Sequence, residues 1–453
     1  MTRIERDSMG EIAVDAERQW GAQTQRSLEN FPIGTETMPA ELLRAFAELK
    51  FAAARANCTL GVLDGERCSA ICDVCREILD GRLAGEFPLK VWQTGSGTQT
   101  NMNFNEVIAG RANRTSGRAL LHPNDHVNRS QSSNDTFPTA MRVSAAETVH
   151  ARLIPAVRSL AAAFGELENR YPKAVTVGRT HLMDAVPIRF SQYVSAWRVM
   201  LEKDCAALER EMPVLLELPL GGTAVGTGLN APPGFGEAAA KELSDLTQIP
   251  FRSGENKFHG LTSLDGFVAV HGIMKALAAD LMKIANDIRH LASGPRCGLG
   301  EITIPANEPG SSIMPGKVNP TQCEAVTMVA AQVMGNDVTV GIAASQGNFQ
   351  LNVFLPVAAY NFLQSVRLLS DVMASFEARL VRGIVPNEAR MRENLERSLM
   401  NVTALSPIIG YDRAAQTAKF AWERNCSLAR AASELGFLTE EEAASALDPL
   451  KMV

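Results

Sequence analysis

The segment from Gly310 to Pro320, with the sequence GSSIMPGKVNP, places two hydroxyls, a cation and an amide on one short stretch. Its glycines and prolines predict a loop, and a helix is predicted to start at Thr321 with Glu324 as its capping-box partner. Two serines and a lysine on a glycine-containing loop suit a lid that closes over an anion and brings a hydroxyl to it. A solvated surface loop has the same composition, so this stretch alone leaves both interpretations open.

Three other segments are rich in hydroxyl and amide side chains and contain few acids. Segment 95–103 precedes a predicted helix, where uncharged hydrogen-bond donors favour an anion, although a plain capped turn has the same composition. Segment 122–135 precedes a helix predicted to start at Pro138, and its residues lack the spacing of a zinc site or a nucleophile elbow. Segment 178–187 holds His181 in a predicted loop, although a lone histidine is more often structural than catalytic.

Together these four polar segments would suit a small dianion. Lys317 and Asn319 could bind and polarise a carboxylate, so that a proton on the neighbouring carbon becomes removable. The reaction then requires a base and a group that helps the leaving group depart. The candidates are Ser311 and His181, with Glu324 able to orient the imidazole. Because serine is a weak base, Ser311 would need loop N–H groups or a nearby cation to stabilise its oxyanion.

The composition is that of a large globular protein. Of 453 residues, 46% are hydrophobic and 21% are charged, which predicts a sizeable core and more than one domain. The formal net charge of −6 argues against a nucleic-acid partner or an anionic membrane surface, since both require a basic face. The first residues are charged, and no apolar run approaches the roughly 18 residues that a membrane span needs. We therefore expect a soluble, cytoplasmic protein.

The eight cysteines show no disulfide-framework spacing, which predicts reduced thiols, as in a cytosol. Cys68, Cys72 and Cys75 have a spacing that would suggest an iron–sulfur site in isolation. On a predicted helix, however, positions i, i+4 and i+7 share one face, so we interpret the three thiols as small apolar core residues.

Long helices dominate the chain from its second quarter onward. Helices of such length are expected to form a bundle. Residues 325–334 are apolar on too many sides for a monomer, which predicts oligomerisation through that bundle. Shorter helices are predicted after residue 388, ending with a capped helix from Thr439 to Leu447, and the glycine-rich segment 218–230 is interpreted as a turn that lets helices approach closely. The long helices are predicted over 139–170, 187–212, 264–292, 321–345 and 357–382.

The segment 310–320 resembles the signature loop of the fumarase/aspartase superfamily, whose members eliminate a group beta to a carboxylate to give fumarate. The resemblance runs from segment 20–27 (WGAQTQRS) to segment 401–405 (NVTAL), and the polar segments match in the same order. Three features are similar to the class II fumarases: His181 where aspartases usually carry glutamine, Gly316 where they carry alanine, and the sequence TQCE that follows the loop.

This resemblance implies a mainly α, three-domain fold with a central long-helix bundle that assembles into a tetramer core. The implied domains are 1–131, 132–388 and 389–453. The implied activity is the reversible hydration of fumarate to (S)-malate, a tricarboxylic acid cycle reaction, by anti elimination or addition of water through an aci-carboxylate carbanion. It also implies a homotetramer whose active sites are shared by three subunits, with no cofactor, metal, nucleic-acid or membrane partner. Two alternatives stay open: a related C4-dicarboxylate lyase acting on aspartate or a methylated fumarate analogue, and a non-catalytic scaffold.

The family's functional residues carry over to matching positions of this chain. Ser311 would take the C3 proton of malate, and His181, paired with Glu324, would manage the proton of the departing hydroxide through water. A second, non-catalytic anion site is implied at His122, Pro123, Asn124 and Asp125. The residues implied to hold the two carboxylates of the substrate are Ser96, Gly97, Thr98, Ser132, Ser133, Asn134, Thr180, Ser312, Lys317, Val318 and Asn319.

Overall fold

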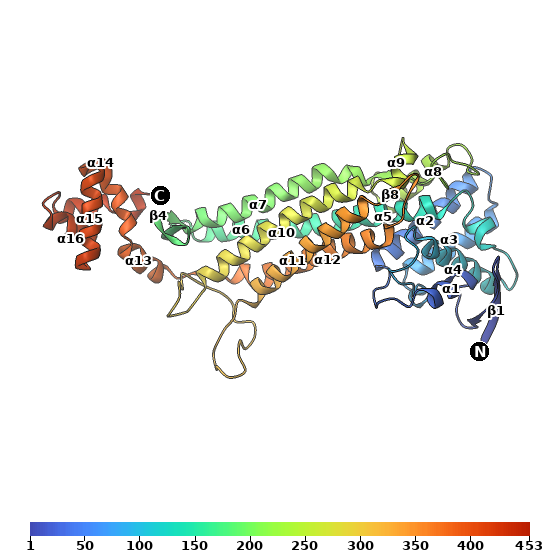
Figure 1. Ribbon diagram of the computed structural model, residues 1–453, viewed down its shortest axis with the longest axis horizontal. Helices are drawn as coiled ribbons and strands as arrows, with labels where there is room; N and C mark the ends of the chain where they lie inside the picture. The colour runs from blue at the N-terminus through green and yellow to red at the C-terminus, as the bar shows by residue number, and fades with distance from the viewer. The chain divides into compact units, whose positions relative to one another are not determined.

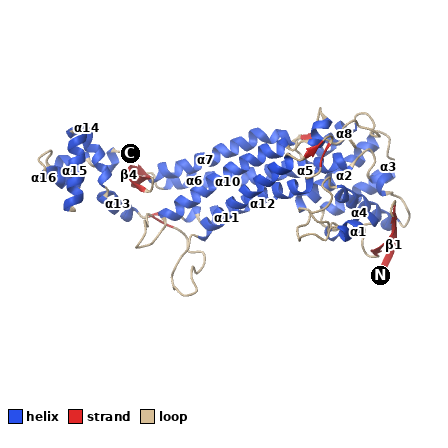
Figure 2. Ribbon diagram, viewed as in Figure 1, coloured by secondary structure: helices blue, strands red, loops and turns tan.

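The computed structural model describes residues 1–453 and is built mainly from helices, with strands only in short pairs (Figure 2). Each sheet has two strands, and all the pairs except β5 with β6 are antiparallel. The predicted mainly α fold is therefore confirmed. The short strands are β5 (Glu217–Leu218), β6 (Arg252–Ser253), β7 (Ile302–Thr303), β8 (Gly347–Asn348), β9 (Leu351–Asn352) and β10 (Val385–Pro386).

The chain begins with a β-hairpin that the sequence did not predict. Strands β1 (Thr2–Asp7) and β2 (Gly10–Asp15) form an antiparallel hairpin, in which Thr2 lies opposite Asp15. The hairpin was missed because it buries little, so it lacks the apolar alternation that marks a half-buried strand. The helices that follow are α1 (Ala22–Asn30), α2 (Ala40–Thr59), α3 (Gly65–Leu79) and α4 (Thr98–Ser116).

The long helices occur where the apolar periodicity predicts them (Figure 1). Two predicted boundaries are wrong. The predicted helix 139–170 is two helices joined by a π-helical turn over 149–153, and it starts at Ser133 because the side chains of Ser132 and Asp135 form a capping box there. The helices are α5 (Ser133–Thr148), α6 (Ile154–Arg170), α7 (Phe190–Glu211), α10 (Asp265–Leu291), α11 (Thr321–Ala344) and α12 (Leu355–Arg379).

The second wrong boundary is the start of α7. Pro187 was predicted to open this helix but lies in strand β4 (Met183–Arg189), which pairs with β3 (Val175–Thr180). Proline is tolerated there because β4 is an edge strand of a two-stranded sheet, where a missing backbone N–H costs little. The remaining helices are α8 (Phe235–Thr247), α9 (Lys257–Thr262), α13 (Glu388–Arg397), α14 (Ser406–Ile409), α15 (Tyr411–Arg424), α16 (Leu428–Glu434) and α17 (Glu440–Ala446).

The chain forms two compact units. The first unit contains residues 1–155, 206–278 and 331–370, and the second contains 156–205, 279–330 and 371–453. Because α7, α10, α11 and α12 each contribute residues to both units, this division follows spatial compactness and not the order of the chain. The domain bounds predicted from the sequence stay a prediction.

In the first unit an aromatic cluster joins α2, α4 and α5. The ring of Phe46 stacks on that of Phe104 with 5.1 Å between centroids and meets the edge of Phe137 at 5.6 Å. All three side chains are fully buried, and burying one of this size contributes about 1.5 to 3 kcal/mol. The cluster therefore holds the N-terminal ends of α4 and α5 in a fixed arrangement. The thiols of α3 are buried in a neighbouring apolar cluster, as predicted.

In the second unit Trp197 of α7 occupies the core. Its ring meets the edge of Phe164 of α6 at 5.6 Å, and its indole N–H donates to Asp287 of α10 at 3.1 Å. Short helices follow α12, as predicted. The last α-helix has the expected cap, because Thr439 and Glu442 form a capping box.

Helix α11 is long and apolar enough to cross a membrane by length and composition, which differs from our expectation. The mean hydropathy of α11 is high because the helix is rich in alanine, glycine and valine, although these residues do not form one continuous apolar run. It also carries Asn336 and Asp337, which hydrogen-bond to neighbouring helices of the first unit. Such a helix is weak evidence for a membrane span. Its exposed apolar residues include Met328, Val338 and Ile342.

Candidate active site

Three of the predicted hydroxyls form a chain in the first unit. The Thr98 Oγ1 atom lies 2.8 Å from Ser96 Oγ and 2.8 Å from Ser133 Oγ. Thr98 is the first residue of α4 and Ser133 the first of α5, so two helix N-termini meet at this chain. Backbone N–H groups and the helix dipole at each end favour an anion. The structure thus brings these three predicted residues together.

The backbone at Gly97 is what allows the two helix ends to approach. Gly97 has a left-handed conformation with φ of 72°, and a Cβ atom there would lie 1.9 Å from the ring of Phe137. Only glycine meets both conditions. Gly97 therefore shapes the site through its backbone, and it has no side chain that could contact a substrate.

The start of α5 is fixed by Asp135, a buried carboxylate that sequence reasoning did not single out. Asp135 accepts the N–H of Ser132 at 2.9 Å and those of Gly221 and Thr223 at 3.1 and 2.8 Å. Asn134 donates its side-chain amide to the carbonyl of Ala224. The glycine-rich segment 218–230 therefore does more than turn the chain, because it anchors the N-terminus of α5.

A buried lysine is hydrogen-bonded to the segment between α4 and α5. Lys50 of α2 is fully buried and donates to the side-chain oxygens of Asn128 and Gln131 at 3.2 and 2.9 Å. The Asn128 oxygen also accepts from Asn101 and Asn105 of α4. Burial lowers the pKa of Lys50 to about 7, and the charge of Asp135 opposes this effect. No local signal in the sequence distinguishes Lys50 from a surface lysine.

His181 lies at the tip of the β3–β4 hairpin in the second unit, and not in an irregular loop. Thr180 pairs with Met183, which leaves a two-residue turn formed by His181 and Leu182. Both have left-handed backbone conformations, with φ of 58° and 63°. This is the pattern of a type I′ turn, which favours Asn-Gly and is unfavourable for leucine. The exposed imidazole is thus presented on a strained turn.

The imidazole faces a cavity of the second unit that has a volume of about 960 Å³. Arg179, Asp184 and Tyr193 line it from β3, β4 and α7. Burial raises the pKa of Tyr193 to about 12, so this phenol stays neutral at physiological pH. Within the chain no hydrogen bond joins His181 to Glu324, although both lie in the second unit. The predicted pairing of these two residues therefore does not form within a single chain.

The segment 310–320 is a loop, as predicted, and its two ends are joined by hydrogen bonds. The N–H of Gly310 donates to the carbonyl of Lys317 at 2.8 Å, and the Asn319 amide donates to the carbonyl of Gly310 at 2.7 Å. A Cβ atom on Gly310 would lie 2.5 Å from the Lys317 oxygen, so this position requires glycine. Ser312, Lys317 and Val318 are exposed.

The Ser311 hydroxyl sits where an oxyanion would be stabilised. Its Oγ atom accepts the backbone N–H groups of Ile313 at 3.2 Å and Met314 at 3.0 Å. Two N–H groups aimed at one oxygen stabilise its negative charge, which lowers the barrier to using serine as a base. The helix after the loop starts at Thr321, as predicted. The Thr321 hydroxyl donates to Glu308, however, and does not form the predicted capping box with Glu324.

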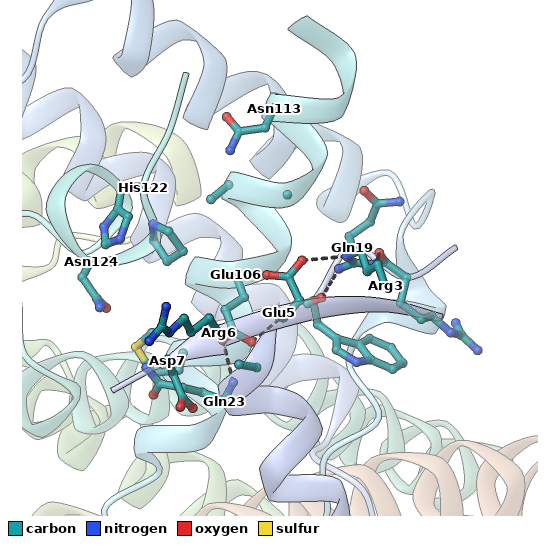
Figure 3. A pocket seen from close by; sticks show the side chains of 18 of the residues that line it. Arg3, Glu5, Arg6, Asp7, Gln19, Gln23, Glu106, Asn113, His122 and Asn124 are labelled. Atoms are coloured by element: carbon teal, nitrogen blue, oxygen red, sulfur yellow. Dashed lines mark hydrogen bonds and ion pairs between the residues drawn. The ribbon is translucent and has the colours of Figure 1, made fainter. Parts of the chain in front are cut away.

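The predicted second anion site borders a separate cavity of the first unit, about 680 Å³ in volume. His122 precedes a π-helical turn over Pro123–Val127, and its Nδ1 atom accepts the N–H of Asp125. Figure 3 shows His122, Asn124 and Arg6 on one side of the cavity and Arg3 and Gln19 on the other. Sequence reasoning missed the arginines because the β1–β2 hairpin that positions them was not predicted.

Arg118 is the basic residue nearest to His122 in the sequence, but it pairs with Glu66 of α3. It is therefore not directed at the second anion site. No group of three or more histidine, cysteine, aspartate or glutamate side chains is arranged to hold a metal ion.

Two protein-family models match the chain. A model described as "Lyase" matches residues 10–335, and one described as "Fumarase C C-terminus" matches residues 402–453. Among curated proteins, the class II fumarate hydratase of Listeria monocytogenes is 55% identical over 452 residues, which is 100% of this chain and 99% of that protein. The class II fumarate hydratase of Bacillus subtilis is 56% identical over 455 residues, covering 100% and 98%.

Solved structures give the same result. A crystal structure of a class II fumarase from Schistosoma mansoni superposes with a TM-score of 0.97 at 41% identity, covering 100% of this chain and 99% of that one. A fumarate lyase:delta crystallin from Brucella melitensis, crystallised with cobalt, gives 0.95 at 43% identity with the same coverage. These matches extend over the full length, so they cover all four polar segments. The chain therefore belongs to the class II fumarate hydratase family and has the mainly α, three-domain fold of the fumarase/aspartase superfamily.

Proposed function

We propose that this protein catalyses the reversible hydration of fumarate to (S)-malate. In the malate-to-fumarate direction, the C3 proton leaves first and gives a carbanion stabilised as an aci-carboxylate, and the hydroxyl then departs from the opposite face. The carbanion requires strong stabilisation of its carboxylate, because a proton beside a carboxylate is very weakly acidic. Lys317 and Asn319 are proposed to bind that carboxylate and to draw charge onto it.

The observation that carries the proposal is the environment of the Ser311 hydroxyl. Its oxygen already accepts two backbone N–H groups, so the alkoxide that must remove the C3 proton has its stabilising donors in place. Such donors stabilise the alkoxide relative to the hydroxyl, which lowers the cost of using serine as a base. Ser312 and Val318 lie on the same loop and are proposed to contact the substrate as it closes.

The hydroxyl chain is proposed to hold the other carboxylate. Ser96, Thr98 and Ser133 offer their hydroxyls together, and Ser132, Asn134 and the backbone of Gly97 complete the two helix ends. Hydrogen bonds from a helix N-terminus to a carboxylate are stronger than neutral ones and impose an orientation. Thr180 would add a hydroxyl beside His181, which handles the proton of the leaving hydroxide through water.

The protein is further proposed to be a cytoplasmic homotetramer whose active sites are shared by three subunits, consistent with an oligomeric family. The exposed apolar residues of α11 would then be buried between copies of the chain. In such an assembly His181 could meet Glu324 of another copy, which would account for the missing contact within one chain. The cavity beside His122, Pro123, Asn124 and Asp125 is proposed as the second anion site, with domain bounds as predicted from the sequence.

The decisive test follows the ultraviolet absorbance of fumarate with purified protein, starting from malate and separately from fumarate. Conversion in both directions supports the proposal, with aspartate as a parallel substrate. Release of ammonia from aspartate without hydration of fumarate would instead identify an ammonia-lyase. Absence of any reaction at high protein concentration would leave only a non-catalytic scaffold.

A further inference from the structure

The residues of the turn that presents His181 do not favour its conformation. A two-residue turn with both residues left-handed favours asparagine and glycine, whereas this chain has histidine and leucine there. Each non-glycine residue in this conformation carries an energetic penalty, and such residues persist only where surrounding contacts impose them. Something outside the turn must therefore hold it.

A contact that could do so is made by Arg179, two residues before His181. Arg179 of β3 donates from both terminal nitrogens to the carboxylate of Glu301, at 2.9 and 2.6 Å. The Glu301 side chain is completely buried, and Asn394 of α13 donates a third hydrogen bond to it at 2.8 Å. The hydrogen bonds to Glu301 also raise the pKa of Arg179, which favours the charged form of the guanidinium. We call these three side chains the Glu301 clamp.

The backbone of Glu301 is fixed as firmly as its side chain. Its N–H donates to the carbonyl of Leu291 at the end of α10, and its carbonyl accepts the N–H of Asn387. The next residues form β7, which pairs with β10. The pairing register of β3 with β4 shifts between Val177 and Arg179, directly before the arginine that meets this anchor. The clamp thus joins the hairpin to the segment that leads into the Ser311 loop.

We propose that the Glu301 clamp is a positioning device for catalysis, which holds the strained turn so that the His181 imidazole stays in the cavity where the leaving hydroxide departs. Arg179, Glu301 and Asn394 are positioning residues, because their contacts act through the backbone of the turn. This inference rests on the proposed role of His181. It assigns the clamp mainly to the turnover step, because Thr180 is one of many groups proposed to hold the substrate carboxylates, whereas His181 supplies the only imidazole proposed for the departing hydroxide.

The test compares wild type with Glu301→Gln, which keeps the shape of the side chain but removes its charge. The expected result is a loss of kcat of at least about ten-fold, with KM for fumarate changed less than about three-fold. The matched control is Glu77→Gln, which breaks a two-pronged ion pair with Arg111 in the first unit. It should leave both constants near wild type. A Glu301→Gln variant with kcat within three-fold of wild type would overturn the proposal.

A rescue experiment separates positioning from a general loss of stability. Leu182→Gly makes the left-handed turn favourable without the clamp. The double variant Glu301→Gln/Leu182→Gly should have a kcat at least three-fold higher than Glu301→Gln alone. The kcat of Leu182→Gly in the wild-type background is the reference for this comparison. Failure to restore any activity would show that the turn is not what the clamp holds. If Glu301→Gln does not fold, Arg179→Lys carries the same expectations, because lysine keeps the charge but loses the two-pronged contact.

A second measurement does not depend on the reaction. Hydrogen–deuterium exchange of the peptide covering 176–189 should be faster in Glu301→Gln than in wild type, and Leu182→Gly should slow it again. If wild type fails to hydrate fumarate, the proposed function is wrong while this exchange experiment still tests the clamp. If wild type is active and exchange over 176–189 is unchanged in Glu301→Gln, the clamp proposal alone fails.

Discussion

A pair of buried carboxyls between two long helices makes stability depend on pH. Asp204 of α7 and Asp280 of α10 are joined by a hydrogen bond, and Asp204 is only 8% exposed. Burial, and then the charge of Asp280, raise the pKa of Asp204 from 3.8 to about 7. The same burial raises the pKa of Asp280. Between about pH 4 and pH 7 the folded pair therefore holds a proton that the unfolded chain releases.

The sign of the effect follows from that proton. The folded state binds it more tightly than the unfolded state, so stability falls as pH rises from about 4 to about 7 and is constant above that. Asp204→Asn has no proton to lose, and its amide keeps a hydrogen bond to Asp280. Its gain over wild type should therefore grow by at most about 2.7 kcal/mol between pH 5 and pH 7. Because Asp280 is partly exposed and water screens the repulsion, we expect about 1 to 2 kcal/mol.

The assay is denaturant unfolding of wild type and Asp204→Asn at pH 5 and pH 8, at one protein concentration. Asp412→Asn, at an exposed position of α15, is the control and should change stability by less than about 0.5 kcal/mol at both values. A gain for Asp204→Asn that is equal at pH 5 and pH 8, or larger at pH 5, would refute the reasoning.

Three further outcomes are expected. Ser311→Ala should reduce kcat at least about 100-fold with KM little changed, because it removes the proposed base; a near wild-type rate in the fumarate assay would exclude that role. Wild-type stability should rise between about pH 7 and pH 10.5, since the lowered pKa of Lys50 favours its neutral form in the folded state; Lys50→Met should lose this part of the rise, measured by unfolding at pH 7 and pH 9.5. Val338→Glu should lower the mass in solution measured by light scattering, whereas Leu450→Glu, at an equally exposed position, should not; equal masses for all three proteins would contradict burial of α11 between copies.

The elements that the sequence predicts well are those with one dominant physical signal. The apolar spacing of Leu277, Leu281 and Ile284 predicts a helix over 264–292, and α10 extends over Asp265–Leu291. The Ser311 loop is predicted by its glycines and prolines, which disfavour a regular helix or strand. Periodicity could not locate the π-helical turn after α5, because the apolar pattern continues through it.

The parts of the site that were missed depend on contacts between distant segments. Arg179 and Glu301 are 122 residues apart, and neither is unusual in its local sequence. The hairpin around His181 was predicted as a loop because histidine and leucine are poor residues for its turn. Residue types indicated a candidate chemistry in these cases, but the tertiary contacts that override local preference are not visible in a single sequence.

The chain of three hydroxyls has a consequence for the range of ligands it can accept. In each of its two contacts either oxygen can be the donor. The protons of Ser96, Thr98 and Ser133 can therefore all reverse direction together by rotation about their C–O bonds, without movement of a heavy atom. In one direction the free proton lies on Ser133 and in the other it lies on Ser96, so reversal moves the available donor from one end of the chain to the other. A ligand that contacts only one end of the chain would thus meet a donor in one direction and a lone pair in the other, with the heavy atoms unchanged.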